Sequence, residues 1–558
     1  MITIQPQYLT LAKLFDGRLF RIPEYQRAYS WTSHQREDLF DDIKKTHVRG
    51  SEAGHFMAAV VGLRRTKQIL GTDEFHVMEV VDGQQRLTTL IILLNALKLA
   101  LDPKNKPEGK LAGELAQLLV KVEGDELLLL QTNHDSSHHF TNYLRKGIAP
   151  SSETAKTISD REILEAIEDC TAFVKSWRDG GETLLSLAAL VKNRLYFILH
   201  EIDDEQAVYT VFEVLNSRGL DVSWLDRLKS ILMGSAFELK KTNHSGVIND
   251  LHTTWRDIYS IIGLRQGLNT EALRFAATLR ASEAPSRPLG EQDAVDALRS
   301  EATSAKKIRV VASWLLDVTR ASDAVIANPR INAVTRISQA RLLATAIHLR
   351  DDIKAPDREK LLKRWEKVSF RIYGMLCRDA RTRVGDYIRL AWRVVNEKLP
   401  VDEIDEAIAE IGTEFTIKDA VAELRNGNCY EGWENELRYV MFRYEESLAK
   451  KQKLNFSNEQ WEKIWMVSPS ESIEHIWPKN KSPERQRHRL GNLVLLPPKL
   501  NSKLQDSAPE DKSEAYRKTG LLIAGEVADL IDSKGWNKAS VEKREEGLLK
   551  WAATEWAD

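Results

Sequence analysis

The chain has 558 residues, more than one hydrophobic core organises, so the length predicts about two to four domains. Its net charge of −2, with 42% hydrophobic and 29% charged residues, is typical of a soluble globular protein. A near-neutral charge predicts that any surface for nucleic acid is a local basic patch. Apolar runs fall far short of the about 20 residues that cross a bilayer, and the N-terminus lacks a signal-peptide pattern, which excludes a membrane protein. Three widely separated cysteines predict no disulfide framework and fit a cytoplasmic location.

The predicted elements change character along the chain. In the first part, residues 54–63, 75–81 and 195–202 are rich in β-branched and aromatic residues and predict strands, and an apolar helix follows the second of them. The middle of the chain shows helical periodicity with little strand signal. The last part has one helix and then short apolar runs. We therefore expect a mostly helical, multidomain α+β fold: an α/β domain at 1–235, an all-α middle at 236–430 and a helical C-terminal domain at 431–558.

Three short polar motifs mark the N-terminal domain. They are IPEYQRAYSW, VVDGQQRLTTL and FEVLNSRGLDVSWLDRLK. In the first, Tyr25, Gln26 and Arg27 offer an aromatic face, an amide and a guanidinium, a set that suits a base and a phosphate. In the third, Asn216 and Arg218 lie near a predicted helix end, which has no special need for both side chains.

The second motif predicts a phosphate site. A strand ends at Asp82 and Gly83, and the helix that follows presents free N–H groups at its N-terminus. Asp82 could hold a magnesium ion, Gln84 or Gln85 could orient a water, and Arg86 could clamp phosphate. The alternative is that Asp82 only caps the helix.

The stretch SIEHIWPKNKSPERQRHRLGNLVLLPPKLNSKL predicts a strand, a basic loop, a second strand and a helix. A neutral imidazole such as His475 can take a proton from water near neutral pH. Oxygen donors from Glu474 and the Asn501 amide suit Mg²⁺ or Mn²⁺. Asn492 is expected to hold the loop by hydrogen bonds to the backbone. Alone, His475 would be explained as a half-buried histidine, and Asn501 as a surface residue.

The loop between the two predicted strands is basic. Beside a cleavage centre, such a loop would grip the DNA backbone without reading sequence, although charged loops are often merely solvated. Its basic residues are Lys479, Lys481, Arg485, Arg487 and Arg489.

Taken together and in this order, the N-terminal motifs resemble the N-terminal domain of GmrSD-type restriction enzymes. The resemblance covers about residues 1–235 and implies a ParB/sulfiredoxin-like core that binds and hydrolyses a nucleoside triphosphate, with Asp82 and Arg86 catalytic. The chain has no GxxxxGK[ST] P-loop, so the phosphate cradle must differ from that one. The implied nucleotide site is lined by Tyr25, Gln26, Arg27, Asp82, Gly83, Gln84, Gln85, Arg86, Asn216 and Arg218.

The order His475, Asn492, Asn501 resembles a ββα-metal HNH finger, and LGNLVLLP with its trailing Asn is similar to the C-terminal domain of the same family, over about residues 431–558. The resemblance implies a nucleotide-regulated, metal-dependent endonuclease of type IV, modification-dependent restriction. Its expected substrate is double-stranded, modified phage DNA. Because relatives are often dimers, a homodimer is one possible state of this chain. The rival interpretations are a nucleotide-sensing, ParB-like DNA-binding protein with a non-cleaving finger, or a nickase.

Overall fold

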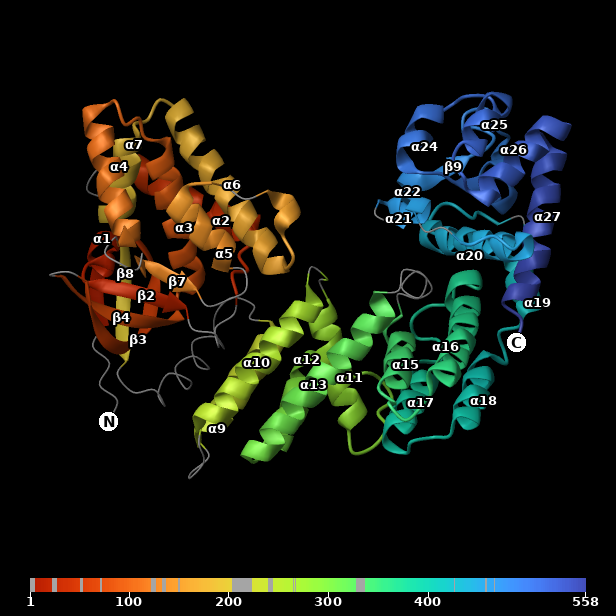
Figure 1. The fold of residues 1–558 in the computed structure, drawn as a ribbon, viewed down its shortest axis with the longest axis horizontal. Helices are drawn as coiled ribbons and strands as arrows, with labels where there is room; N and C mark the ends of the chain where they lie inside the picture. The colour runs from red at the N-terminus through yellow and green to blue at the C-terminus, as the bar shows by residue number, and fades with distance from the viewer. Residues whose placement is uncertain are drawn as a thin grey trace. The chain divides into compact units, whose positions relative to one another are not determined.

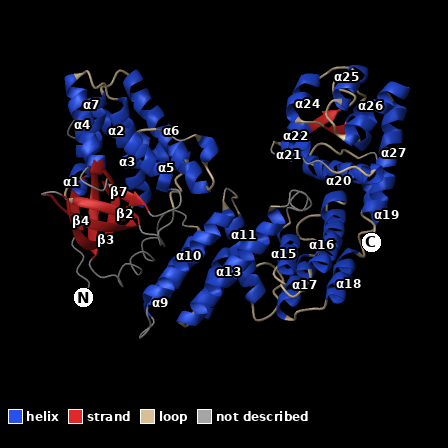
Figure 2. Ribbon diagram, in the orientation of Figure 1, coloured by secondary structure: helices blue, strands red, loops and turns tan. Residues whose placement is uncertain are grey.

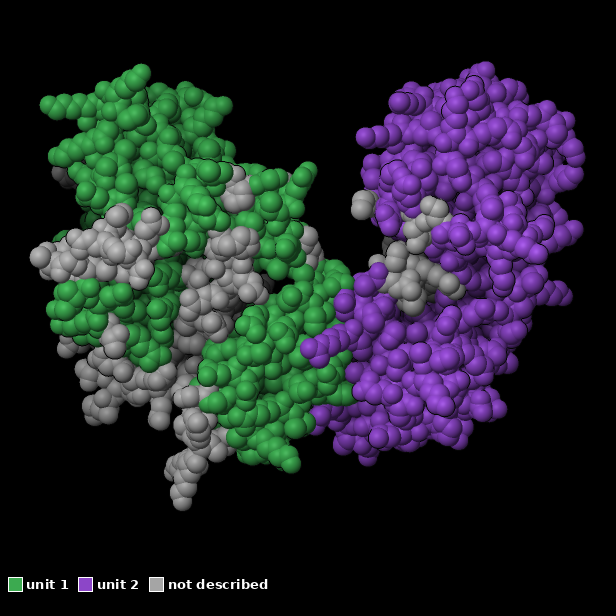
Figure 3. All heavy atoms as spheres, in the orientation of Figure 1, with its two compact units in different colours: residues 1–273, 291–319 green, residues 274–290, 320–558 purple. Residues whose placement is uncertain are grey.

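The computed structural model describes residues 6–22, 28–50, 54–70, 73–121, 127–132, 137–148, 151–202, 223–238, 244–263, 265, 267–327, 337–425, 427–456, 459–465 and 467–558. The chain forms two compact units, residues 1–273 with 291–319, and residues 274–290 with 320–558 (Figure 3). This division differs from the three predicted domains, because the helices of the expected middle domain are shared between the two units.

The first unit contains a mixed six-stranded sheet (Figure 2). Its strand order is β1-β8-β3-β4-β2-β7, with β3 antiparallel to β4 and parallel to β8. The strands predicted at 54–63, 75–81 and 195–202 are confirmed as β3, β4 and β8. The strands are β1 (Pro6–Thr10), β2 (Arg18–Ile22), β3 (His55–Leu70), β4 (Asp73–Asp82), β7 (Leu130–Thr132) and β8 (Leu195–Ile202), and a separate pair is β5 (Val120–Lys121) with β6 (Leu127–Leu128).

The helices that precede β8 in the chain gather on one side of this sheet, and the later helices of the unit form a separate group (Figure 1). The central one, α3, is apolar on nearly its whole circumference, because it is enclosed by the sheet and by neighbouring helices. Arg36 on α2 is fully buried and pairs with Glu162, Glu165 and Asp169 on α6, which fixes these two helices together. The helices are α1 (Leu11–Phe15), α2 (Ser33–Val48), α3 (Gln84–Ala100), α4 (Lys106–Leu119), α5 (Ser137–Lys146), α6 (Ile158–Asp179), α7 (Leu184–Asn193), α9 (Trp224–Glu238), α10 (His244–Ile262), α12 (Glu291–Glu301) and α13 (Ala305–Ile326); α11 (Leu268–Arg280) crosses the unit boundary.

The second unit is helical apart from one short hairpin, β9 (Ile473–His475) with β10 (Leu493–Leu495), seen in red among helices in Figure 2. Its apolar core surrounds that hairpin. In the described part of the chain, no helix is long and apolar enough to cross a membrane. The helices are α15 (Ser338–His348), α16 (Ala355–Ser369), α17 (Val384–Asn396), α18 (Val401–Gly412), α19 (Ile417–Leu424), α20 (Glu434–Gln452), α21 (Glu459–Trp465), α22 (Pro469–Ser472), α23 (Glu484–Arg487), α24 (Pro498–Leu504), α25 (Pro509–Arg517), α26 (Leu522–Lys534) and α27 (Lys538–Glu555).

Candidate active site

The predicted strand, basic loop, strand and helix of the C-terminal stretch are present as β9, a loop containing α23, β10 and α24. In the hairpin register, His475 lies opposite Leu493, and Glu474 lies opposite Val494. Successive strand residues point to opposite faces. The hairpin therefore directs His475 and Glu474 into two different environments.

Asn492 closes the loop, as the sequence predicts. Its side chain is fully buried, and its Oδ1 accepts hydrogen bonds from the Trp477 backbone N–H at 2.9 Å and from Trp536 Nε1 at 3.2 Å. Its Nδ2 donates to the carbonyls of Trp477 at 3.1 Å and Arg487 at 3.0 Å. Because every polar atom of this amide is hydrogen-bonded to the protein itself, Asn492 positions the loop. This corrects the prediction that counted Asn492, with His475, among the catalytic residues.

His475 is buried with 5% of its surface exposed. Its Nε2 lies 3.1 Å from Nδ1 of His488, and the Tyr430 ring packs edge-on against it with a centroid separation of 4.8 Å. Burial, assisted by the charge of Lys479, lowers the pKa of His475 to about 3. The imidazole is therefore neutral at physiological pH.

Glu474 faces away from His475 and lies in a buried ion pair. Lys512 Nζ donates to Glu474 Oε1 at 2.5 Å and to the carbonyls of His475 at 3.0 Å and Ile476 at 3.4 Å. The Tyr516 hydroxyl donates to the same carboxylate oxygen at 3.0 Å. Burial raises the pKa of Glu474, and Lys512 and Tyr516 offset only part of that rise. The prediction that Glu474 binds the metal ion is therefore corrected, because Lys512 already supplies the cation that neutralises this carboxylate.

Asn501 is held by its amide nitrogen. Nδ2 donates to the carbonyls of Glu471 at 2.8 Å and Ile473 at 3.2 Å, which orients the side chain so that Oδ1 stays available as an oxygen ligand. Among the described residues, no group of three or more His, Cys, Asp or Glu side chains is arranged to hold a metal ion. The donor set therefore fits Mg²⁺ or Mn²⁺ only in part, through Asn501.

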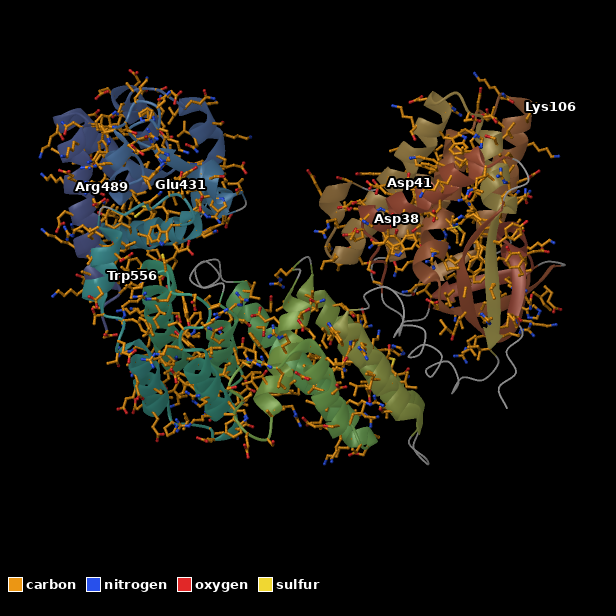
Figure 4. All side chains as sticks on the ribbon, turned by 180° about the vertical axis from the view of Figure 1, so that it is seen from behind. Asp38, Asp41, Lys106, Glu431, Arg489 and Trp556 are labelled. Carbon is orange, nitrogen blue, oxygen red and sulfur yellow. The ribbon has the colours of Figure 1, made fainter. Side chains whose placement is uncertain are left out.

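Some basic residues of the loop are held by partners within the protein, and the others are able to contact DNA. Arg489, labelled in Figure 4, is a correction to the predicted DNA contacts: it is buried and pairs with Glu545 and Glu542 on α27. Lys481 Nζ donates to the Asp506 carbonyl at 2.7 Å.

The remaining basic side chains of the loop carry no ion pair within the described chain. Lys479 lies over the Tyr430 ring, with Nζ 4.1 Å from the centroid. Arg485 is exposed. Arg487 Nε is buried without a hydrogen-bond partner in the part of the chain that the structure describes. The charges of Lys479 and Arg487 both act on the His475 imidazole, so two uncompensated cations lie near it.

In the first unit, the second N-terminal motif forms the expected strand-to-helix turn. β4 ends at Asp82, and α3 begins at Gln84. Gly83 has φ 94°, and a Cβ there would lie 3.1 Å from Val60 Cγ2, so the turn requires glycine. Gly83 is the N-cap residue of α3, so Asp82 lies one residue before the cap.

The same turn contacts the second half of the first motif. Gln85 Oε1 accepts from the Ser30 backbone N–H at 2.9 Å, and its Nε2 donates to the Ala28 carbonyl at 3.2 Å. Gln85 therefore holds the backbone of the first motif in place, whereas the sequence predicts that Gln84 or Gln85 orients a water. Arg86 has its guanidinium carbon 5.9 Å from the Trp31 ring centroid. Burial lowers the pKa of Arg86, and the carboxylates of Asp82 and Asp42 oppose that effect.

The structure assembles only part of the predicted nucleotide site. Gln84 is buried beside Gln85 at the start of α3, and Asp82 and Arg86 flank them. Within the described residues, the Arg86 guanidinium is near the Trp31 ring and the charges of Asp82 and Asp42, and we expect it to be able to bind an anion. The remaining predicted residues lie outside the described residues: Tyr25, Gln26, Arg27, Asn216 and Arg218.

Three residues of the C-terminal site are not predicted from the sequence. His488 lies inside the basic run and is hidden among its arginines. Lys512 and Tyr430 lie well outside the quoted motif, and only the packing of α25 and of the loop before α20 brings them to the hairpin. A histidine inside a basic loop beside a candidate general base is the one signal that could have pointed to His488.

Comparison with known proteins gives two matches to family models. The family model described as GmrSD restriction endonuclease, N-terminal domain, matches residues 11–233, and the one described as GmrSD restriction endonucleases, C-terminal domain, matches residues 416–551. A search of curated proteins found no match. The two domain matches together span more than half of the chain in the order of the family. The chain belongs to the GmrSD restriction endonuclease family, and its role is that of a restriction endonuclease acting on DNA.

Proposed function

We propose that the second unit hydrolyses DNA phosphodiester bonds with His475 as the general base. The observation that carries the proposal is a neutral, buried imidazole with one ring nitrogen held by His488, next to the unpaired cation of Arg487. In the proposed step, His475 takes a proton from water, and the resulting hydroxide forms a bond to phosphorus. The phosphorus–oxygen ester bond breaks, and its electron pair leaves on the departing oxygen, which takes a proton from solvent.

Mg²⁺ or Mn²⁺ dependence is part of the proposal. A bound ion would neutralise charge on the phosphate. Magnesium commonly keeps several waters and binds substrate phosphates with few protein ligands, so a single Asn501 oxygen is compatible with it. Glu474 is left out of this ligand set because Lys512 engages it.

DNA contact through the basic loop makes a measurable prediction. Arg487→Ala should weaken DNA binding and reduce the slope of log K against log salt by about one, because one phosphate contact is lost. Arg517→Ala is the matched control, since Arg517 is paired with Asp529 and Asp532 on the surface of the same unit. Binding of a short duplex measured at several salt concentrations gives both slopes. An Arg487→Ala slope equal to that of the wild type would contradict the contact.

We propose further that the first unit binds and hydrolyses a nucleoside triphosphate with magnesium, and that nucleotide state controls cutting. The support is the glycine turn at Gly83, the N-terminus of α3 directly after it, and the Arg86 guanidinium beside Asp82. Arg86→Ala should lower nucleotide hydrolysis at least about tenfold, since an arginine on transferred phosphate contributes this much or more. Lys110→Ala, exposed on α4, is the control.

The readouts for that variant are nucleotide hydrolysis and the nucleotide dependence of DNA cleavage. DNA cutting by Arg86→Ala with unchanged nucleotide dependence would rule out control by this site.

We propose modified phage DNA as the substrate and the bacterial cytoplasm as the place of action. Equal cleavage of phage DNA with native and with modified bases would argue against modification dependence.

A second candidate function is a nucleotide-sensing DNA-binding protein with a non-cleaving finger. The engaged Glu474 carboxylate is the observation in its favour. Metal-dependent cleavage that His475→Ala abolishes separates the two, because a protein that only grips DNA has no use for a general base. Gel analysis of supercoiled plasmid also separates a nickase from an enzyme that cuts both strands.

A further inference from the structure

We infer that His488, backed by Glu431, is a positioning residue that holds His475 in the tautomer needed for proton abstraction. The inference rests on the proposed function of His475 and extends it to the atoms that orient the base. A neutral imidazole carries one ring proton, and the nitrogen that lacks it is the one that accepts. Which nitrogen of His475 accepts is therefore decided by what its other nitrogen contacts.

The two rings meet through specific nitrogens. His475 Nε2 and His488 Nδ1 are 3.1 Å apart, the separation of a hydrogen bond. With Nε2 engaged, Nδ1 is the nitrogen of His475 left for a water. The backbone also fixes the partner, because the Cys429 N–H donates to the His488 carbonyl at 2.8 Å and ties the loop to the segment before α20.

The charge of Glu431 favours one direction of this hydrogen bond. Its Oε1 lies 3.9 Å from His488 Nε2, and its Oε2 accepts from Asn428 Nδ2 at 3.0 Å, which places the negative charge beside this nitrogen of the ring. A carboxylate favours a proton on the nitrogen that faces it. With the proton on its Nε2, His488 accepts at Nδ1, His475 must donate from Nε2, and Nδ1 of His475 keeps its lone pair.

Aromatic packing holds both rings in this geometry. Tyr430 stacks on His488 with 9° between the ring planes and a centroid separation of 5.2 Å, and it meets His475 edge-on. Lys479 covers the Tyr430 ring. The arrangement follows the logic of a carboxylate that orients a catalytic histidine, with one additional imidazole in between.

A divalent ion shared by the two imidazoles is the competing explanation for nitrogens this close. Such an ion needs further ligands. The described residues offer no third His, Cys, Asp or Glu at a suitable position, and the one nearby carboxylate faces the far nitrogen of His488. The hydrogen bond therefore accounts for the geometry better than an ion does.

The test uses the full-length protein with His488→Ala and His488→Asn, because an Asn oxygen can accept near the Nδ1 position. We expect kcat to fall about 10–100-fold in His488→Ala with KM for DNA nearly unchanged, and to recover to within about threefold of wild type in His488→Asn. Glu431→Gln should lower kcat less than His488→Ala. Its control is Glu484→Gln, an exposed carboxylate in the loop between β9 and β10 that also contains His488. Unchanged kcat in His488→Ala overturns the inference. An equal loss of kcat in His488→Ala and His488→Asn also overturns it. If both variants lose Mn²⁺ binding as well, the two imidazoles share a metal ion.

A second measurement does not depend on cleavage. In protein labelled with ¹⁵N-histidine, the His475 ring, assigned by its absence in His475→Gln, should show a protonated Nε2 and an unprotonated Nδ1. In His488→Ala the two tautomers should mix. The opposite tautomer in the wild type would overturn the inference even if the enzyme cuts DNA. An inactive wild type with the expected tautomer would instead contradict the proposed function and leave the His488 assignment supported.

Discussion

His475→Ala should lower the rate of DNA cleavage by about 10²–10⁴-fold, the usual contribution of a general base. Binding of DNA should persist, because phosphate contacts of the basic loop do not involve this side chain. His475→Gln is the sharper variant, since its amide can still donate toward His488 Nδ1 but cannot accept a proton from water. His34→Ala, at an exposed histidine of the first unit, is the control. Cleavage by His475→Gln at the wild-type rate would remove His475 as the base.

The same residue makes the pH dependence unusual. A general base works only while it is neutral, and His475 is protonated only below its lowered pKa of about 3. Because kcat/KM reports the free enzyme, it should change less than about twofold between about pH 7.5 and about pH 5.5. A histidine with the ordinary pKa of about 6.5 would lose about tenfold over that interval. A fall of that size would show that another histidine, or an unshifted one, limits the reaction.

Lys512→Met should destabilise the second unit by about 3–5 kcal/mol. The substitution leaves the Glu474 carboxylate buried without its cation, and an uncompensated buried charge costs this much. The carbonyls of His475 and Ile476 lose a donor at the same time, so cleavage should fall together with stability. Urea titration measures the change in the free energy of unfolding, and hydrogen exchange of the amides in β9 and β10 reports whether the hairpin itself is destabilised.

Two variants make this result specific. Lys518→Met removes an exposed lysine just beyond α25, paired with Glu514, and should change stability by less than about 0.5 kcal/mol. The double variant Glu474→Gln, Lys512→Met should recover part of the loss, because it removes the buried charge together with its partner. A double variant no more stable than Lys512→Met would mean that the ion pair is not the source of the effect.

Local sequence patterns determined much of this protein. Strand β8 has the predicted bounds, the turn at Gly83 lies where a strand gives way to an apolar helix, and the hairpin surrounds Asn492 as expected. Such features depend on periodicity and backbone conformation within a few residues, which the sequence displays directly. The family resemblance, carried by the same short motifs, is confirmed by the domain matches.

Tertiary packing alone decided what the candidate site residues contact. Glu474 and His475 are neighbours in sequence, yet a strand sends them to opposite faces, where α25 brings Lys512 to one and the loop before α20 brings Tyr430 to the other. Arg489 belongs to a basic run but packs against α27, which supplies Glu545. Burial and charge partners arise from residues far apart in the chain, so no local pattern distinguishes a metal ligand from an ion pair, or a DNA contact from a structural anchor.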